Sequence, residues 1–173
     1  MTRLFSLLII GVLALNACNA TNSGRSQQLG ADGQPLPKVY RIRGSETSKI
    51  QFRMLDSVNS LRQASGLQAV QLNGQLNAAA STHSRDMSAQ NRPWHFGSDG
   101  SSPLERVLRA GYLGTMLGEV ISETYEAELE TLAAWMDQSD TRDVLMDARG
   151  TQMGFAWYQE SNGKIWWTLI IGG

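Results

Sequence analysis

Residues 152–171 have the sequence QMGFAWYQESNGKIWWTLII, and this stretch decides the class of fold. Two segments rich in aromatic and β-branched residues, 152–158 and 165–171, flank the tripeptide Ser161-Asn162-Gly163. Aromatic and β-branched side chains favour strands, and an Asn-Gly pair between two such segments is typical of a hairpin turn. We therefore predict a pair of antiparallel strands over these residues.

Two segments that precede the hairpin, beginning near Ser48 and after Asn73, have the periodicity of helices. The first begins near Ser48, where Ser48 and Gln51 can form a capping box, and it ends at Gly66. The second begins after Asn73. Apolar side chains recur at helical spacing in both segments; they are Ile50, Met54, Val58 and Leu61 in the first, and Leu72, Leu76, Ala79, Ala80, His83 and Met87 in the second.

Two shorter helices are predicted downstream of these. Ser102, Pro103 and Glu105 supply an N-cap, a proline at the first helical position and a glutamate at the third, and Gly111 ends the segment. The next helix has three glutamates near its N-terminus, where the helix dipole favours negative charge. Its apolar positions are Leu129, Leu132, Ala133 and Met136, and its glutamates are Glu126, Glu128 and Glu130.

The remaining segments complete the predicted fold. Residues 118–125 alternate too irregularly for a fully buried strand, and residues 39–43 fit either a short strand or a segment that lies on the domain. Helices therefore come first and a hairpin last. This order predicts an α+β fold in which helices cover a mainly antiparallel sheet.

Length, charge and cysteine content exclude several classes of protein. A chain of 173 residues is sufficient for one domain with a proper core. With 15 basic and 16 acidic residues it lacks the excess positive charge of a nucleic-acid binder. Cys18 is the only cysteine, so an intramolecular disulfide and a CxxC motif are both excluded.

Cys18 follows a segment typical of a signal peptide. Arg3 precedes the apolar run 4–15, LFSLLIIGVLAL, which is too short to span a bilayer as a helix. Leu15-Asn16-Ala17-Cys18 then resembles a bacterial lipobox. The resemblance implies cleavage after residue 17 and acylation of Cys18, which would attach the protein to a membrane. The alternative is an ordinary secreted protein in which Cys18 has no role.

Three regions follow from these observations: a lipoprotein signal peptide (1–17), a lipidated cysteine with a flexible tether (18–47) and a folded domain (48–173). The tether is rich in Asn, Ser, Gly and Gln, which cannot offset the entropy of ordering. We expect a monomer whose partners are the membrane, through the anchor, and a small ligand, lipid or peptide, but no nucleic acid.

An ordered set of residues in the domain resembles the bacterial branch of the CAP superfamily (cysteine-rich secretory proteins, antigen 5, pathogenesis-related 1), also called SCP domains. The resemblance covers about residues 50–171 and implies an α-β-α sandwich. The residues that carry it are Asn59, Arg62, Gly66-Leu67, Leu72, His83-Ser84-Arg85-Asp86-Met87, His95-x-Gly97, Arg106, Gly111-Tyr112, Gly118-Glu119, Trp135-Met136, Arg142 and Met153-Gly154.

The resemblance also implies a cleft that can hold a divalent metal in some members. Its histidine and glutamate correspond to His95 and Glu119, but Thr141 stands where a second histidine is usual and Val120 where an asparagine is usual. A threonine hydroxyl is a poor substitute for imidazole at zinc. Glu123 would lie about 13 Å along the strand from Glu119 and cannot complete the site. Asp140 is a weak replacement, so we expect at most weak binding of zinc or calcium.

Other polar and aromatic residues have simpler interpretations. His83 lies on the apolar stripe of its helix, where a structural histidine with satisfied hydrogen bonds is commoner than a ligand. The five tryptophans are expected to pack in the core and at its edges. Trp94 is an exception, because its place beside His95 in a loop makes it a candidate contact at the rim of the cleft.

These observations leave three candidate functions. The first is a non-catalytic binding module in the cell envelope, tethered to the outer membrane and facing the periplasm. The second is a metal-assisted hydrolase that uses His95 and Glu119. The third is a purely structural envelope protein. The chain lacks a Gly-x-Ser-x-Gly motif and has no free cysteine nucleophile, and we assign no catalytic residue. The missing second histidine favours the first and third functions.

Overall fold

The computed structural model describes residues 39–173. The signal peptide, Cys18 and most of the predicted tether therefore lie outside the described residues. The elements in chain order are η1 (Gly44–Glu46), α1 (Thr47–Ala64), β1 (Gln71–Leu72), α2 (Gly74–Gln90), α3 (Pro103–Arg109), β2 (Met116–Thr124), α4 (Glu128–Asp137), α5 (Ser139–Leu145), β3 (Gln152–Gln159) and β4 (Ile165–Gly172).

The predicted hairpin forms the centre of a four-stranded sheet with the order β1-β3-β4-β2. β3 pairs with β4 in antiparallel register from Gln152↔Gly172 to Gln159↔Ile165. Gly163 makes the turn possible because it has a φ of +104°, a conformation that side chains with a Cβ rarely adopt. β2 is antiparallel to β4, and only the short β1 is parallel to its neighbour β3. The prediction of a mainly antiparallel sheet is confirmed.

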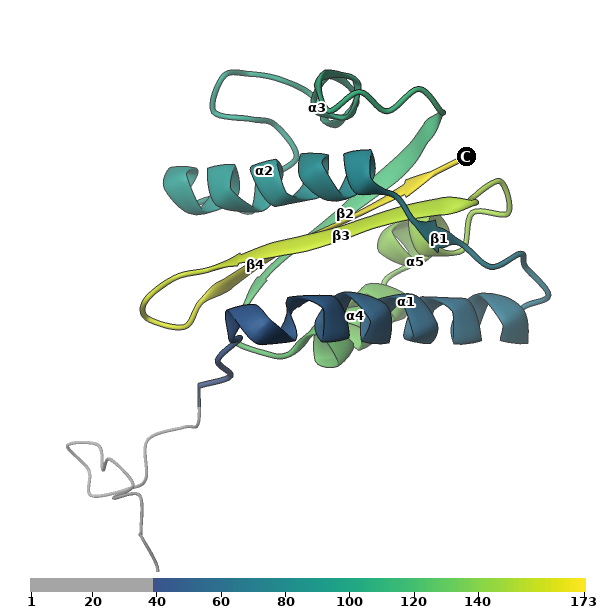
Figure 1. The fold of residues 1–173 in the computed structure, drawn as a ribbon, viewed down its shortest axis with the longest axis horizontal. Coiled ribbons are helices and arrows are strands. Elements are labelled where there is room, and N and C mark those ends of the chain that lie inside the picture. Colours follow the sequence, from purple (N-terminus) through teal and green to yellow (C-terminus); the bar gives the residue numbers. More distant parts are fainter. Residues whose placement is uncertain (1–38) are drawn as a thin grey trace, which may run out of the picture. The chain divides into compact units, whose positions relative to one another are not determined.

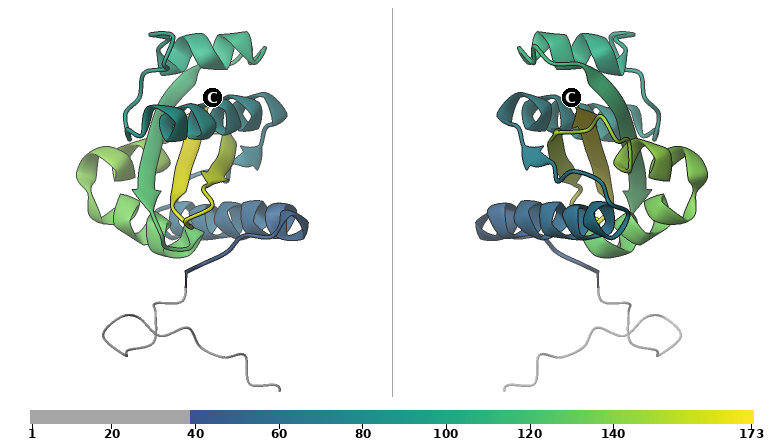
Figure 2. Two further views of the ribbon diagram at one scale, coloured as in Figure 1. Left: turned by 90° about the vertical axis from the view of Figure 1, so that its left-hand side faces the viewer. Right: turned by 90° about the vertical axis from the view of Figure 1, so that its right-hand side faces the viewer.

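Helices cover both faces of this sheet (Figure 1). α2 and α3 lie on one side, and α1, α4 and α5 lie on the other, as the two end-on views in Figure 2 show. This arrangement is the predicted α-β-α sandwich. None of the helices within residues 39–173 has both the length and the apolar character needed to cross a bilayer.

The predicted start signals of two helices form as expected. The side chain of Asn73 accepts hydrogen bonds from the backbone N–H groups of Gln75 and Leu76 at the start of α2. Ser102 and Glu105 form a reciprocal capping box at the start of α3. These contacts satisfy N–H groups that have no partner inside the helix, which explains why so short a helix as α3 begins at Pro103.

The predicted capping box at Ser48 and Gln51 is wrong. The turn η1 precedes α1, whose N-cap is Glu46, so Ser48 already lies inside the helix. Gln51 instead donates from Nε2 to the carbonyl of Phe155 in β3 at 2.9 Å. A tertiary hydrogen bond to the sheet has therefore replaced the expected local one.

The buried face of α4 also differs from the prediction. Leu132 is buried, but Leu129 is 41% exposed and Ala133 is exposed. The inward face is completed by Glu128, Thr131 and Trp135. Glu128 tolerates burial because Tyr40 donates to it at 3.0 Å and Arg53 forms an ion pair with it. β1 and α5 were not predicted.

Residues 39–43 do not form a strand but lie against the domain. Tyr40 binds Glu128, and the backbone N–H of Ile42 donates to Oε1 of Gln159 at 3.0 Å. Gln159 donates in return from Nε2 to the carbonyl of Tyr40 at 2.7 Å. The contacts of the domain thus begin before residue 48.

The sheet separates two apolar clusters. The larger one lies on the side of α1 and α4 and includes three buried side chains from α1, namely Ile50, Met54 and Val58. The smaller one lies under α2 and α3 around Leu76 and Ile170. The smaller cluster leaves room for several buried polar groups on the α2 side of the sheet.

Candidate functional site

The candidate site is built around the carboxylate of Glu119 in β2. The side chain of Glu119 is only 1% exposed. Side chains from three other parts of the chain approach it: His83 from α2, His95 from the loop after α2, and Arg106 from α3. The fold therefore brings together two histidines, an arginine and a glutamate from four separate segments of the chain.

Arg106 forms the strongest contact with Glu119. Its Nη2 lies 2.9 Å from Oε1 and 2.9 Å from Oε2, and Nη1 donates to the carbonyl of His95 at 2.8 Å. Charge-assisted hydrogen bonds of this kind are about twice as strong as neutral ones. The guanidinium thus neutralises the carboxylate and holds the backbone of the His95 loop. Its Nε, however, is buried without a hydrogen-bond partner among the described residues.

His95 occupies the open side of the site. Its Nδ1 lies 3.0 Å from Oε1 of Glu119, and its side chain is 48% exposed. The loop that carries it is held tightly at Gly97, where a Cβ would lie 2.6 Å from Oδ1 of Asp99 and 2.6 Å from Oγ of Ser101. The carboxylate contact occupies Nδ1 and leaves Nε2 without a hydrogen-bond partner among the described residues.

His83 occupies the buried side of the site. It is fully buried, and its Nε2 lies 3.7 Å from Oε1 of Glu119. Neither ring nitrogen has a hydrogen-bond partner among the described residues. Burial lowers the pKa of His83 below its usual value, although the nearby Glu119 acts in the opposite direction. His83 is buried as predicted, but within residues 39–173 its ring nitrogens make no hydrogen bond of ordinary geometry.

Trp94 fixes the loop to the end of α2. Its indole Nε1 donates to Oε1 of Gln90 at 2.8 Å, and the guanidinium of Arg92 lies 3.8 Å from the centroid of its ring. The ring of Phe96 is tilted against it, with 5.6 Å between the two centroids. Trp94 is half-buried by these neighbours and directly precedes His95.

Asp140 and Thr141 lie on α5, on the other side of the sheet from α2 and α3. The Thr141 hydroxyl donates to the carbonyl of Trp135 at 2.5 Å, and Asp140 is exposed. Neither residue forms a hydrogen bond with His95 or Glu119 within the described part of the chain. Thr141 thus stabilises the junction of α4 and α5.

The residues around Glu119 do not fit the divalent-metal site that the family resemblance implies. Residues 39–173 contain no group of three or more His, Cys, Asp or Glu side chains placed to hold a metal ion. Both carboxylate oxygens of Glu119 already bind Arg106, whose positive charge would repel a cation at this position. The sequence pattern predicts His83 only as a structural histidine and does not place Arg106 at the site, because nothing in their spacing shows that they meet a strand residue.

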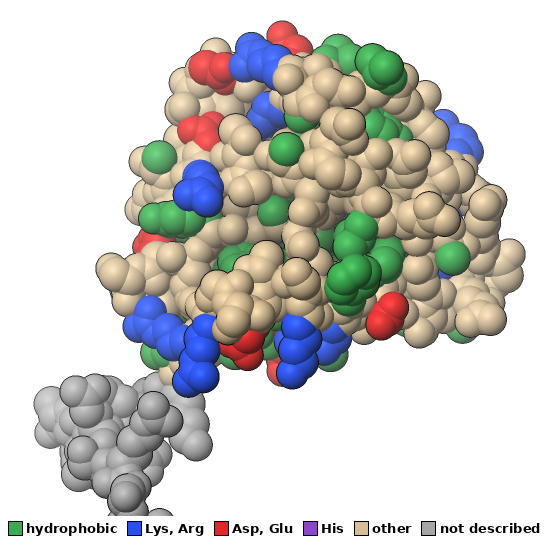
Figure 3. All heavy atoms as spheres, viewed as in Figure 1, with side chains coloured by type: hydrophobic (Ala, Val, Ile, Leu, Met, Phe, Trp, Pro, Cys, Tyr) green, Lys and Arg blue, Asp and Glu red, His purple; other side chains and the backbone are tan. Residues whose placement is uncertain are grey.

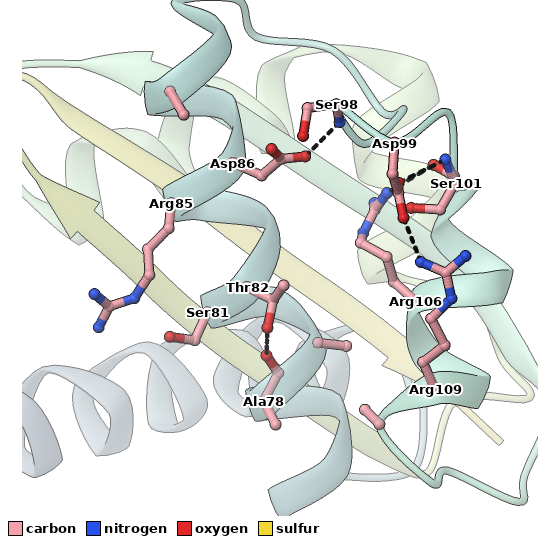
Figure 4. A pocket seen from close by; sticks show the side chains of 13 residues that line it. Ala78, Ser81, Thr82, Arg85, Asp86, Ser98, Asp99, Ser101, Arg106 and Arg109 are labelled. Carbon is pink, nitrogen blue, oxygen red and sulfur yellow. Dashed lines mark hydrogen bonds and ion pairs between the residues drawn. The ribbon is translucent and has the colours of Figure 1, made fainter.

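A cavity of about 680 Å³ lies beside this site, between α2 and α3 (Figure 4). Its wall includes Arg106, and the ion pair of Asp99 with Arg109, 2.5 Å apart, lies at its rim. Oδ2 of Asp86 accepts a hydrogen bond from the backbone N–H of Ser98 at 2.7 Å, and this bond holds the loop over one end of the cavity. The hydrogen bonds from Ser101 and the neighbouring Arg109 hold the pKa of Asp99 well below its usual range. Arg106 therefore belongs both to the wall of this cavity and to the Glu119 site.

Comparison with known proteins agrees with this architecture. Residues 55–171 match the Cysteine-rich secretory protein family (CAP). The uncharacterized protein YkwD of Bacillus subtilis (strain 168) is 28% identical over 128 residues, which is 74% of this chain and 49% of that protein. The chain thus spans about half the length of this curated relative.

Solved structures share the same fold. An extracellular protein containing an SCP domain from Bacillus anthracis str. Ames matches 76% of this chain and 44% of its own, with a TM-score of 0.66 and 20% identity. An outer surface protein from Borrelia burgdorferi matches 77% of this chain and 96% of its own, with a TM-score of 0.62 and 16% identity. The family match covers most of the chain, and the chain accordingly belongs to the CAP family of cysteine-rich secretory proteins.

Proposed function

We propose that this protein is a non-catalytic binding module of the cell envelope that holds a small ligand, lipid or peptide at the exposed imidazole of His95. The observation that carries the proposal is the state of Glu119. Its carboxylate is buried, paired with Arg106 through both oxygens and bonded to His95. A carboxylate whose two oxygens are already engaged in this way positions the imidazole and is a poor ligand for a metal ion and a poor acceptor for a substrate proton.

We further propose that Cys18 carries a lipid that anchors the domain at the outer membrane, on the periplasmic side. The support is the apolar run 4–15 and the lipobox-like Leu15-Asn16-Ala17-Cys18. Two structural neighbours, an extracellular protein and an outer surface protein, support an envelope location. Mass spectrometry of the mature N-terminus tests the anchor, and an unmodified thiol or cleavage at another position would refute it.

A titration of the full chain, purified in detergent, with zinc and then with calcium tests the absence of a resident metal. We expect no saturable one-to-one binding in the micromolar range, because a carboxylate held by a guanidinium is a poor ligand. Tight zinc binding that disappears in His95→Ala would overturn this part of the proposal. Asp140→Ala is the matched control, since its carboxylate is exposed on α5.

A hydrolase is the second candidate, and the His95–Glu119 contact is the observation that favours it. An imidazole oriented through Nδ1 by a carboxylate presents Nε2 as a general base. Ester or amide hydrolysis by the full chain that is lost in both His95→Ala and Glu119→Gln would support this function over binding alone. Activity that survives both substitutions would come from elsewhere.

A further inference from the structure

β3 is an edge strand over most of its length. β1 pairs only with its first two residues, Gln152 and Met153. From Gly154 to Gln159 no strand in the described part of the chain lies on that side of β3. This edge faces the space between α1 and α2 (Figure 1). Hydrophobic side chains are exposed between these two helices on the face shown in Figure 3.

The hydrogen bonds along this edge follow a two-residue repeat. The carbonyls of Thr151 and Met153 accept from the backbone of the β1 segment at 3.0 and 2.9 Å. At Phe155 side chains replace the missing strand, since its N–H donates to Oδ1 of Asn77 and its carbonyl accepts from Nε2 of Gln51. Alternate residues of a strand direct both backbone groups to the same side. The N–H and C=O of Trp157 therefore also face outward.

No side chain or loop within residues 39–173 bonds to these two groups of Trp157. They open into a cavity of about 420 Å³ that is lined by Ala156 and Trp157 from β3, Thr47 and Gln51 from the start of α1, and Asn77, Ser81 and Arg85 from α2. Gln51 and Asn77 close one end at Phe155, and Gln159 closes the other through its bonds to Tyr40 and Ile42. The opening therefore exposes the backbone of β3 over about one two-residue repeat.

Arg85 supplies a charge beside this opening. Its side chain projects from α2 away from α3, as does that of Ser81 (Figure 4). The guanidinium lies 5.7 Å from the centroid of the Tyr158 ring. Arg85 is exposed and forms no ion pair among the described residues. The cavity thus offers an unpaired strand edge and an uncompensated positive charge at the same place.

We propose that this edge binds a short, extended, carboxylate-bearing peptide as an added β-strand. One residue of the peptide exchanges two backbone hydrogen bonds with Trp157, and a carboxylate lies near Arg85. Strand addition of this kind gains affinity from backbone bonds and specificity from side-chain pockets. At about 3.3 Å per residue, an opening of this size holds roughly three residues. The site is separate from His95 and Glu119, and it stands whether or not the proposed function is correct.

The test is an NMR titration of the 15N-labelled full chain in detergent micelles. The first probe is acetyl-Val-Thr-Val with a free C-terminal carboxylate, the second its C-terminal amide, and the third acetyl-Val-Thr-Glu-amide. We expect a saturable shift of the Trp157 amide resonance with a dissociation constant near 1 mM for the first probe, since the contact area is small. The amide should bind about fivefold more weakly, which is the loss of one exposed ion pair. The third probe shows whether a side-chain carboxylate replaces the terminal one.

Substitutions locate the contacts. Arg85→Gln should weaken binding of the free-acid probe about fivefold and leave binding of the amide probe unchanged. Arg109→Gln is the matched control, because it changes an exposed arginine at the other cavity beside α2 and should have no effect. A probe N-methylated at its central residue should not bind, because it lacks the N–H that pairs with Trp157.

Three results would overturn the proposal: no shift of the Trp157 amide with any probe, equal binding of the N-methylated probe, or shifts confined to residues 98–101 together with loss of binding in Arg109→Gln. The last result would place the peptide between α2 and α3. His95→Ala separates the two proposals, because it should leave this titration unchanged and affect only binding at the His95 site.

Discussion

Two arginines are buried in the described part of the molecule, and their surroundings differ. Arg62 in α1 is 0% exposed, and its donors reach the carbonyls of Gln68, Leu145, Asp147 and Gly150 at 2.8 to 3.0 Å. Arg106 in α3 is 6% exposed and binds a carboxylate, with its Nε unpaired. Arg62 binds only backbone, whereas Arg106 binds a second ionised side chain.

This difference separates a structural region from a candidate functional one. Burial lowers the pKa of Arg62 from its ordinary value, yet its carbonyl partners tie α1 to the loop before β1, to the end of α5 and to the loop that follows α5. Around Arg106 the polar groups are incompletely satisfied, because its Nε and both nitrogens of His83 lack partners among the described residues. Native proteins keep such unsatisfied buried groups rarely, and mostly at functional sites.

The largest expected effect is that of Arg62→Met. The substitution leaves four carbonyls without their donor, at a cost of about 1–3 kcal/mol for each buried group that stays unpaired. We expect the free energy of unfolding to fall by at least about 4 kcal/mol, measured by urea denaturation. Arg62→Lys should recover part of this loss. A loss below about 2 kcal/mol for Arg62→Met would contradict the structural role.

Arg106→Met should have the next largest effect. It leaves the carboxylate of Glu119 buried without its cation, which typically costs about 3 kcal/mol or more. The double variant Arg106→Met with Glu119→Gln should regain most of this stability in the same denaturation experiment, because the uncompensated charge is gone. If the double variant is no more stable than the single one, charge compensation is not what Arg106 provides.

The pH dependence of the free energy of unfolding should report the lowered pKa of His83 in the folded state. Its pKa is lowered in the folded state, so below pH 6.5 the unfolded chain binds a proton that the folded chain does not. Stability from this group is fully present above pH 6.5 and is lost as the pH falls toward the lowered pKa, by at most about 1.4 kcal/mol per pH unit.

His83→Leu should therefore flatten the curve of unfolding free energy against pH below about pH 6.5. Met87→Leu, at another buried position of α2 without a titratable side chain, is the control and should leave this slope in place. An unchanged slope in His83→Leu would show that His83 does not titrate differently in the two states.

The smallest effect is expected for Ser102→Ala, which removes the N-cap of the helix that carries Arg106. Loss of such a cap costs about 1 kcal/mol. Thermal unfolding followed by circular dichroism should show the shift, and Ser98→Ala, at an exposed loop position, should be near neutral. A Ser102→Ala variant as stable as the wild type would mean that tertiary contacts alone hold α3.

Much of the fold could be predicted because its signals are local. Asn73 and Ser102 cap their helices, and the Asn-Gly turn joins β3 to β4 as expected. The errors occur where distant residues compete with local ones. Gln51 binds the sheet instead of the helix terminus, and Glu128 is buried because Tyr40 and Arg53 bind it.

The candidate site was predicted only in part. The family resemblance placed His95 and Glu119 together, and they lie 3.0 Å apart. It did not assign Arg106 or His83 to the site. The periodicity of α2 places His83 on an apolar face, but the absence of a hydrogen-bond partner among the described residues depends on what packs there.

The sequence by itself determined the class of fold, four of the helices and the strand hairpin, because propensity, capping and turn chemistry act over a few residues. It also carries the lipobox-like Cys18, which lies outside the described residues. Only the tertiary structure decided that Glu119 is neutralised by a guanidinium and that Trp157 lies on an open strand edge. Both depend on segments that are far apart in the chain, and the energies of buried charges and unpaired backbone groups are set by what those segments place beside them.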